Sequence, residues 1–318
     1  MSVPTQIIVN RQAAVPSPTT PVGPTRWDDA GSAYPVDIKQ GVRHALDALY
    51  RDGSEWTQLA VDDARALGAA HPGCLAYIHP AMGMGLPADG IPVAASSTSK
   101  FAYVYSLAAN KLRVDQTGAE ALRPLRTMVG TRPVMENVAT SGDTAGSMRG
   151  SLPSVGNISQ FDIFLNAKTT ANGNLITIIG SISTGANAEF VTVGVSSGFP
   201  QLIVRNPPTG AAVVTTLTST TPFPTAMGTY HAQVDFVANT GALYFVAADG
   251  TVTTLIAPAT LSSPAVPGGV NAGSLTLRLG GNGGSRRWYG QMGQVLIRTD
   301  LAQTAAARAG MTATLPLA

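Results

Sequence analysis

Between residues 160 and 298 the sequence is a succession of short apolar segments separated by turn signals. Apolar and polar residues alternate along many of these segments, which is the pattern of half-buried strands. Asn172-Gly173-Asn174, Asn239-Thr240-Gly241 and Asp249-Gly250 are typical tight turns between such strands. Regular spacing of this kind predicts an antiparallel sandwich. We expect its strands at residues 160–167, 175–181, 190–195, 201–205, 213–217, 230–237, 243–247, 251–256, 275–279 and 291–298.

The last two of these strands flank a glycine-rich loop at Gly280–Gly284. In the first, leucines at 275, 277 and 279 alternate with Thr276 and Arg278; the second follows Trp288-Tyr289-Gly290 and carries Met292, Val295 and Ile297. This arrangement, with the paired segments on either side of Asn239-Thr240-Gly241, resembles the laminin-G-like, concanavalin A-like jelly rolls of lectins, glucanases and virion fibres. The resemblance implies a jelly roll from about residue 152 to the C-terminus, and it implies fold more strongly than function.

The rest of the chain divides by composition and periodicity. Prolines prevent a helix in residues 1–35, which we predict to be an extended, proline-rich anchoring arm. Residues 36–72 have helical periodicity and predict a short helical hairpin, which packs either against copies of itself or a partner protein, or as a small local core under the next segment. Residues 73–150 contain short strand patterns at 75–78, 101–107, 111–114 and 127–139, the last interrupted by Pro133, and predict a small β-rich linker domain.

Charge favours a domain boundary near Gly150. Residues 151–318 hold 7 basic and 5 acidic side chains, against 13 and 13 in the shorter segment before them. The predicted fold class is therefore mainly β: a C-terminal concanavalin A-like jelly-roll sandwich over 151–318, preceded by the extended arm, the short helical hairpin and the small β-linker domain.

Signals for catalysis are few. The histidines at 44, 71, 79 and 231 have no metal-ligand spacing, and the single cysteine, Cys74, excludes an internal disulfide and a cysteine-based zinc site. A glycosidase needs two facing carboxylates. The sandwich offers only Asp162, Glu189, Asp235, Asp249 and Asp300, and it lacks the Glu-x-Asp-x-x-Glu run of glucanases that share this fold. We predict no enzyme activity, no catalytic residues, no cofactor and no metal.

Glycan binding needs an aromatic platform beside polar groups. The predicted glycan-binding residues are Arg286, Arg287, Trp288 and Tyr289, next to the glycine loop. The alternative is that the two aromatic residues close the end of the sandwich while the arginines are a solvated pair. The alternating aromatic residues of Phe101–Tyr105 have the same two interpretations, stacking surface or packed core.

The composition favours a particle protein. The chain is only 12% charged with a net charge of +2, which does not suggest nucleic acid as a partner. It has no apolar run of the roughly 18 residues that a membrane helix needs, and its N-terminus does not resemble a secretory signal.

We predict a structural protein of a bacteriophage particle: a head fibre, capsid decoration or tail fibre on the virion surface. Residues 1–72 would attach it to other virion proteins, the chain would form a homo-oligomer, most simply a trimer, and the lectin-like jelly roll would serve host attachment by binding surface glycans. The alternative is a secreted carbohydrate-active enzyme or carbohydrate-binding module.

Overall fold

The structure is a computed structural model of the chain. It describes residues 73–85, 93–94, 100–108, 112–116, 123–130, 132–137, 147–153, 155–180, 189–206, 213–281 and 288–299. The predicted arm (1–35) and helical hairpin (36–72) lie outside these residues. The described part of the chain is built from strands alone, and it includes no helix long and apolar enough to cross a membrane.

The strands follow the predicted segments closely in the second half of the chain. Their bounds are β1 (Cys74–Gly85), β2 (Val93–Ala94), β3 (Tyr103–Ser106), β4 (Arg113–Asp115), β5 (Leu125–Val129), β6 (Arg132–Asn137), β7 (Met148–Leu152), β8 (Asn157–Ile158), β9 (Gln160–Thr169), β10 (Gly173–Gly180), β11 (Glu189–Ser196), β12 (Phe199–Asn206), β13 (Val213–Thr218), β14 (Gly228–Asp235), β15 (Thr240–Ala247), β16 (Val252–Thr260), β17 (Val270–Asn271), β18 (Leu275–Leu279) and β19 (Gly290–Thr299).

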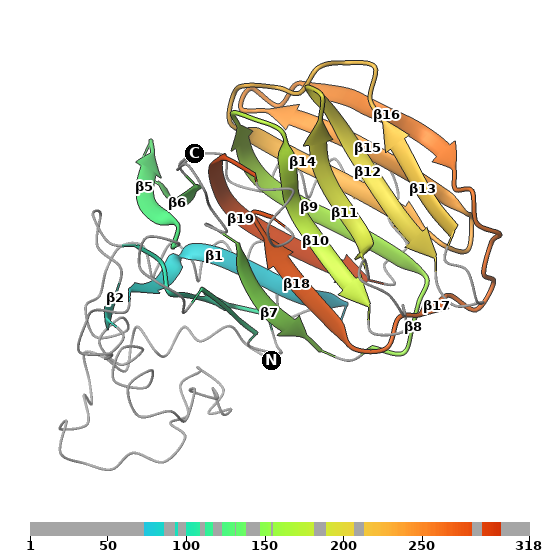
Figure 1. The fold of residues 1–318 in the computed structure, drawn as a ribbon, viewed down its shortest axis with the longest axis horizontal. Coiled ribbons are helices and arrows are strands. Elements are labelled where there is room, and N and C mark those ends of the chain that lie inside the picture. Colours follow the sequence, from blue (N-terminus) through green and yellow to red (C-terminus); the bar gives the residue numbers. More distant parts are fainter. Residues whose placement is uncertain are drawn as a thin grey trace, which may run out of the picture.

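Antiparallel pairing arranges most of these strands in two layers (Figure 1). One layer, the front sheet, has the order β13-β12-β11-β10-β18-β7. The other, the back sheet, has the order β16-β15-β14-β9-β19-β1. Strands β3 and β4 connect the two layers at one side, because β3 pairs with β1 and β4 pairs with both β3 and β7. The predicted jelly-roll sandwich is therefore confirmed.

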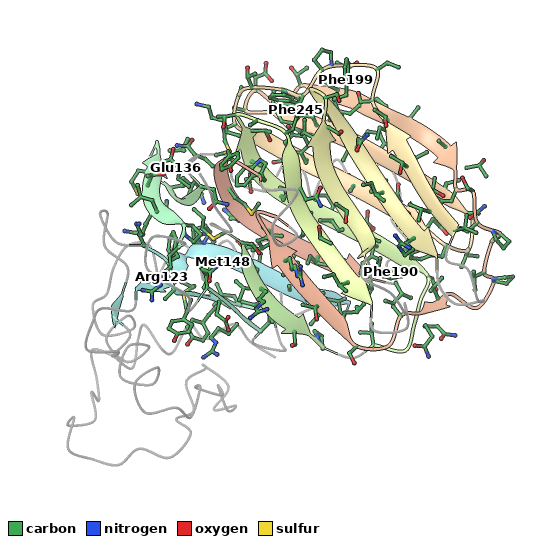
Figure 2. The ribbon with its side chains drawn as sticks, viewed as in Figure 1. Arg123, Glu136, Met148, Phe190, Phe199 and Phe245 are labelled. Carbon is green, nitrogen blue, oxygen red and sulfur yellow. The ribbon has the colours of Figure 1, made fainter. Side chains whose placement is uncertain are left out.

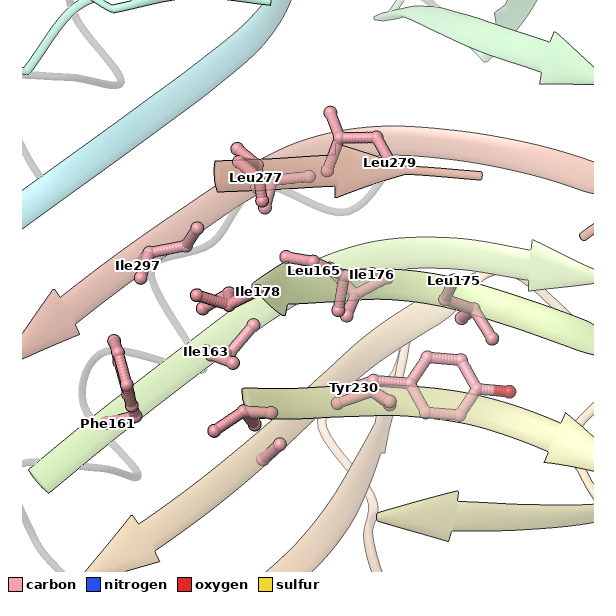
Figure 3. Packing of buried hydrophobic residues seen from close by; sticks show 14 of the residues in the cluster. Phe161, Ile163, Leu165, Leu175, Ile176, Ile178, Tyr230, Leu277, Leu279 and Ile297 are labelled. Atoms are coloured by element: carbon pink, nitrogen blue, oxygen red, sulfur yellow. The ribbon is translucent and has the colours of Figure 1, made fainter. Parts of the chain in front are cut away.

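Apolar side chains from both layers fill the space between them. Figure 3 shows Ile163 of β9, Ile178 of β10, Leu277 of β18 and Ile297 of β19 meeting there, and all four side chains are inaccessible to solvent. Figure 2 labels Met148, Phe190 and Phe245, which belong to the same core. Burying one side chain of this size contributes about 1.5–3 kcal/mol. The core is what fixes which face of each strand points outward.

The predicted boundary at residue 150 is wrong, because it falls inside β7 (Met148–Leu152), which pairs along its length with β18. Strand β1 is also part of the back sheet, where it pairs with β19. Leu75, Phe101 and Val114 belong to the same core as the later strands. Strands β1, β3, β4 and β7, which pair with the later strands or with one another, are therefore part of the sandwich and not of a separate linker domain. The change in charge content at residue 150 therefore does not mark where the core ends.

Candidate ligand-binding face

Three strands at one side of the sandwich place a group of polar side chains on the outer surface. We call this group the arginine patch, and it consists of Arg113 and Asp115 of β4, Arg149 and Ser151 of β7, and Thr276 and Arg278 of β18. Arg149 and Ser151 are exposed, and the other four are partly buried.

Alternation along each strand explains why these side chains face outward. In β18 the leucines at 275, 277 and 279 are buried in the core, so Thr276 and Arg278 lie on the opposite face. In β7 the inward positions are Met148 and Leu152, and in β4 the inward position is Val114. The core therefore determines the position of the patch.

Register brings the patch residues from different strands side by side. Arg278 lies opposite Arg149, and Arg149 lies opposite Asp115 on its other side. Thr276 lies opposite Ser151 in the neighbouring row. Residues opposite each other in antiparallel strands have Cβ atoms about 4.5–5.5 Å apart, so the two arginines are direct neighbours.

The arginine at position 113 is oriented by two contacts. Its Nη2 lies 3.4 Å from Oδ2 of Asp115, and its guanidinium carbon lies 4.8 Å from the centroid of the Tyr103 ring. An ion pair with this exposure contributes little to stability, but together with the cation–π contact it fixes where the charge points. Gly150 allows β4 to approach, since a Cβ there would collide with the carbonyl oxygen of Arg113.

A second polar group lies on the outward-facing positions of the back sheet, but it is closed to solvent. His231 Nε2 lies 2.8 Å from Asp162 Oδ1, and both side chains are almost completely buried. The Phe164 ring stacks on the imidazole with centroids 4.1 Å apart and planes 7° apart. Nearby on the same face, the Tyr77 hydroxyl donates to Gln294 Oε1 at 2.5 Å. Burial makes this group a structural network rather than a ligand site.

Cys74, close to this network, is an inert thiol. Burial raises its pKa to about 12, an effect partly offset by the charge of Arg298. The thiolate, which is the nucleophilic form, is therefore negligible near neutral pH.

The described residues also contain no group of three histidine, cysteine or carboxylate side chains arranged to hold a metal.

The predicted glycan-binding residues are only partly in view. Arg286 and Arg287 lie outside the described residues. Trp288 is 1% exposed, and its Nε1 donates to Thr169 Oγ1 at 3.2 Å. Because the indole presents no face to solvent, a sugar ring cannot stack on it in this conformation, and its burial fits the alternative in which it closes the end of the sandwich. Tyr289 is partly buried, and its role stays a prediction.

Sequence reasoning found part of the arginine patch and missed the rest. Alternation placed Thr276 and Arg278 on the outer face, as observed. Arg113, Asp115 and Arg149 were not considered, because they lie in the segment predicted to be a separate domain. Of the alternating aromatic residues, Phe101 lies in the core, whereas Tyr103 and Tyr105 follow in β3 and are mostly buried. Tyr103 contributes to the patch only as the support beneath Arg113.

No protein-family profile and no curated protein matches the sequence. Among solved structures, an arabinofuranosidase complexed with arabinofuranosyl-α-1,2-xylobiose is similar with a TM-score of 0.51 and 11% identity, covering 79% of this chain and 65% of that one. The CBM40 of the Ruminococcus gnavus IT-sialidase, bound to α2,3 sialyllactose, gives a TM-score of 0.37 and 13% identity over 49% of this chain and 83% of that one. The binding domain of botulinum neurotoxin serotype C1 gives 0.46 and 8%, over 76% and 52%. At these identities the similarity concerns the fold.

Proposed function

We propose that this chain is a non-enzymatic structural protein of a bacteriophage particle whose lectin-like jelly roll binds a glycan on the host surface. The observation that carries the binding part is the arginine patch, where hydroxyl and guanidinium groups are held on three paired strands. Such groups match the hydroxyl and acidic groups of sugars, and a strand framework holds them without ordering a loop. The arabinofuranosidase that shares the fold is complexed with a saccharide, which is a reason to test saccharides first.

The absence of catalysis is part of this proposal. Asp162 is hydrogen-bonded to His231, and Asp235 Oδ1 accepts hydrogen bonds from the backbone nitrogens of Val237 and Ala238. Asp249 likewise accepts from the backbone nitrogen of Thr251. These three carboxylates stabilise a buried pair and two turns, which supports the proposal because glycoside hydrolysis needs two carboxylates that face each other.

The particle location and the assembly rest on the sequence. The proline-rich arm (1–35) and the apolar stripe of the predicted hairpin (36–72) need a surface to cover them, and other virion proteins or copies of this chain would provide it. We expect a homo-oligomer, most simply a trimer. Light scattering on the full chain measures this, and a monomer at micromolar concentration would contradict it.

Two measurements test the proposed function. Mass spectrometry of particles purified from a lysate that contains this protein should find the chain in stoichiometric amounts; its absence from the particles rejects the virion location. Binding of the purified full chain to immobilised bacterial surface polysaccharides should be saturable. If the chain instead releases sugars from them, it is the enzyme of the alternative hypothesis.

A further inference from the structure

The arginine patch concentrates positive charge on a sheet that is otherwise nearly neutral. It contains three arginines and one aspartate, whereas the outward positions at the opposite edge of the front sheet include a single charged residue, Arg205, beside Gln201, Val214, Thr216 and Thr218. Arg149 and Arg278 lie directly opposite each other on neighbouring strands, and Arg149 is exposed. An anion that reaches both guanidinium groups is attracted by two positive charges that the sheet holds side by side.

The chemistry of the patch selects among anions. A guanidinium group offers a planar fork of donors that matches the two oxygens of a carboxylate. The neighbouring row supplies hydroxyls from Ser151 and Thr276, two residues along each strand and therefore about 7 Å away. A ligand that carries one carboxylate beside several hydroxyls can bind the arginine pair through its carboxylate and the Ser151–Thr276 pair through its hydroxyls.

We infer that the arginine patch binds the carboxylate of an acidic saccharide, with Arg149 and Arg278 as its two forks. Arg113, fixed by Asp115 and Tyr103, extends the positive field at the edge of the site. The inference rests on the proposed glycan binding and adds the class of sugar. It also assigns binding to residues other than the predicted Trp288 and Tyr289, which precede β19 (Gly290–Thr299).

The test uses the full chain and polysaccharides that differ in their carboxylates. Polygalacturonate, alginate and hyaluronate are the acidic probes, while methyl-esterified polygalacturonate and dextran are the neutral ones. Polyglutamate is a carboxylate without a sugar. We expect binding to at least one acidic polysaccharide and none to its esterified form. Arg149→Gln and Arg278→Gln should each weaken it about tenfold or more, because a hydrogen bond to a charged group contributes about 1.5–3 kcal/mol.

Matched variants distinguish binding by the arginine patch from nonspecific attraction of an acidic polysaccharide to positive charge elsewhere on the protein. Arg205→Gln removes an arginine from β12, and two strands, β11 and β10, lie between β12 and β18. Because this arginine lies outside the patch, the variant should bind the acidic polysaccharide as the original chain does. The double variant Arg149→Lys/Arg278→Lys keeps both positive charges but loses the planar guanidinium donors. It should therefore retain only part of the affinity for the acidic polysaccharide. Unfolding midpoints of all variants should equal that of the original chain, since the substituted side chains lie outside the core.

The outcomes distinguish the inference from the proposed function. Equal binding of esterified and acidic forms, or unchanged binding by the Arg149→Gln/Arg278→Gln variant, overturns the carboxylate site but leaves glycan binding standing. Binding of polyglutamate as tightly as the polysaccharides overturns the assignment to a saccharide. If none of the saccharides binds, both the inference and the proposed glycan binding fail.

Discussion

At the scale of single residues, the buried pair of His231 and Asp162 is the most consequential contact outside the apolar core. Both side chains lie on outward-facing positions of the back sheet, yet neither is accessible to water. Sequence alone gave no sign of it, since the two residues are far apart in the chain and each looked like an isolated polar residue on a strand. The pairing follows from the register of β9 with β14, where His231 lies opposite Phe164, two positions from Asp162.

Removal of one member of this pair should be costly. We expect His231→Ala to lower the free energy of unfolding by about 3 kcal/mol, because it removes a buried hydrogen bond to Asp162 and the ring that stacks on Phe164, while Arg298 stays opposite Asp162. Urea denaturation of the full chain measures this. Thr216→Ala, at an exposed position, serves as the control and should change stability by less than about 0.5 kcal/mol. A similarly small loss for His231→Ala would contradict the structural role.

Tyr230 should make the fold sensitive to alkaline pH. Burial raises its pKa from 10.0 to about 12. The unfolded chain therefore releases this proton at lower pH than the folded chain, so the stability contributed by Tyr230 is complete below pH 10 and is lost as pH rises through about 12. We expect Tyr230→Phe, which keeps the ring, to lose less stability than the original chain across that window in pH-dependent urea denaturation. Parallel curves for the two proteins would be evidence against this assignment.

At the scale of elements, local patterns predicted strands well and turns less well. Strand β18 has the predicted alternation of buried leucines with Thr276 and Arg278. In contrast, the segment 127–139 was interpreted as one strand interrupted by Pro133, whereas the chain turns after Gly130, whose φ is 58°, and Pro133 lies within β6. A proline is compatible with a strand where its missing N–H is not needed, so its presence does not locate a strand end.

Gly150 tests how the patch is built. A side chain at this position would collide with the carbonyl oxygen of Arg113 and push β4 away from β7. We expect Gly150→Ala to cost about 2 kcal/mol of stability, as overpacking commonly does, and to weaken any ligand binding by the patch. Gly156→Ala is a matched control, since a Cβ there would meet nothing within 4 Å. Equal thermal unfolding midpoints for the two variants would show that β4 adjusts without cost.

At the scale of the whole molecule, the jelly roll depends on pairings that no local pattern predicts. The first strand, β1, pairs with the last, β19, although more than 200 residues separate them. The strand pattern of residues 160–298 was sufficient to predict a sandwich, but the sandwich is completed by strands that precede residue 150. For the same reason four of the six residues of the arginine patch, Arg113, Asp115, Arg149 and Ser151, could not be placed from the sequence.

The pairing of early strands with late ones predicts how fragments of the chain behave. The sequence suggested that residues 151–318 fold alone, but such a fragment lacks β1, β3, β4 and most of β7. It would expose one edge of β19 and of β18, and it would lose core side chains that include Leu75, Phe101 and Val114. Each lost side chain of this size removes about 1.5–3 kcal/mol, so these three alone remove about 4.5–9 kcal/mol, which is comparable to the roughly 5–15 kcal/mol by which domains are usually stable.

We therefore expect fragment 151–318 to be insoluble or to unfold without a cooperative transition, and fragment 73–318, which retains every described strand, to unfold cooperatively. Circular dichroism during thermal unfolding of both fragments measures this. Cooperative unfolding of 151–318 would mean that the later strands form a core without β1, and that the earlier strands are an addition to an independent domain. Failure of both fragments would instead indicate that residues 1–72 contribute to the stability of the sandwich.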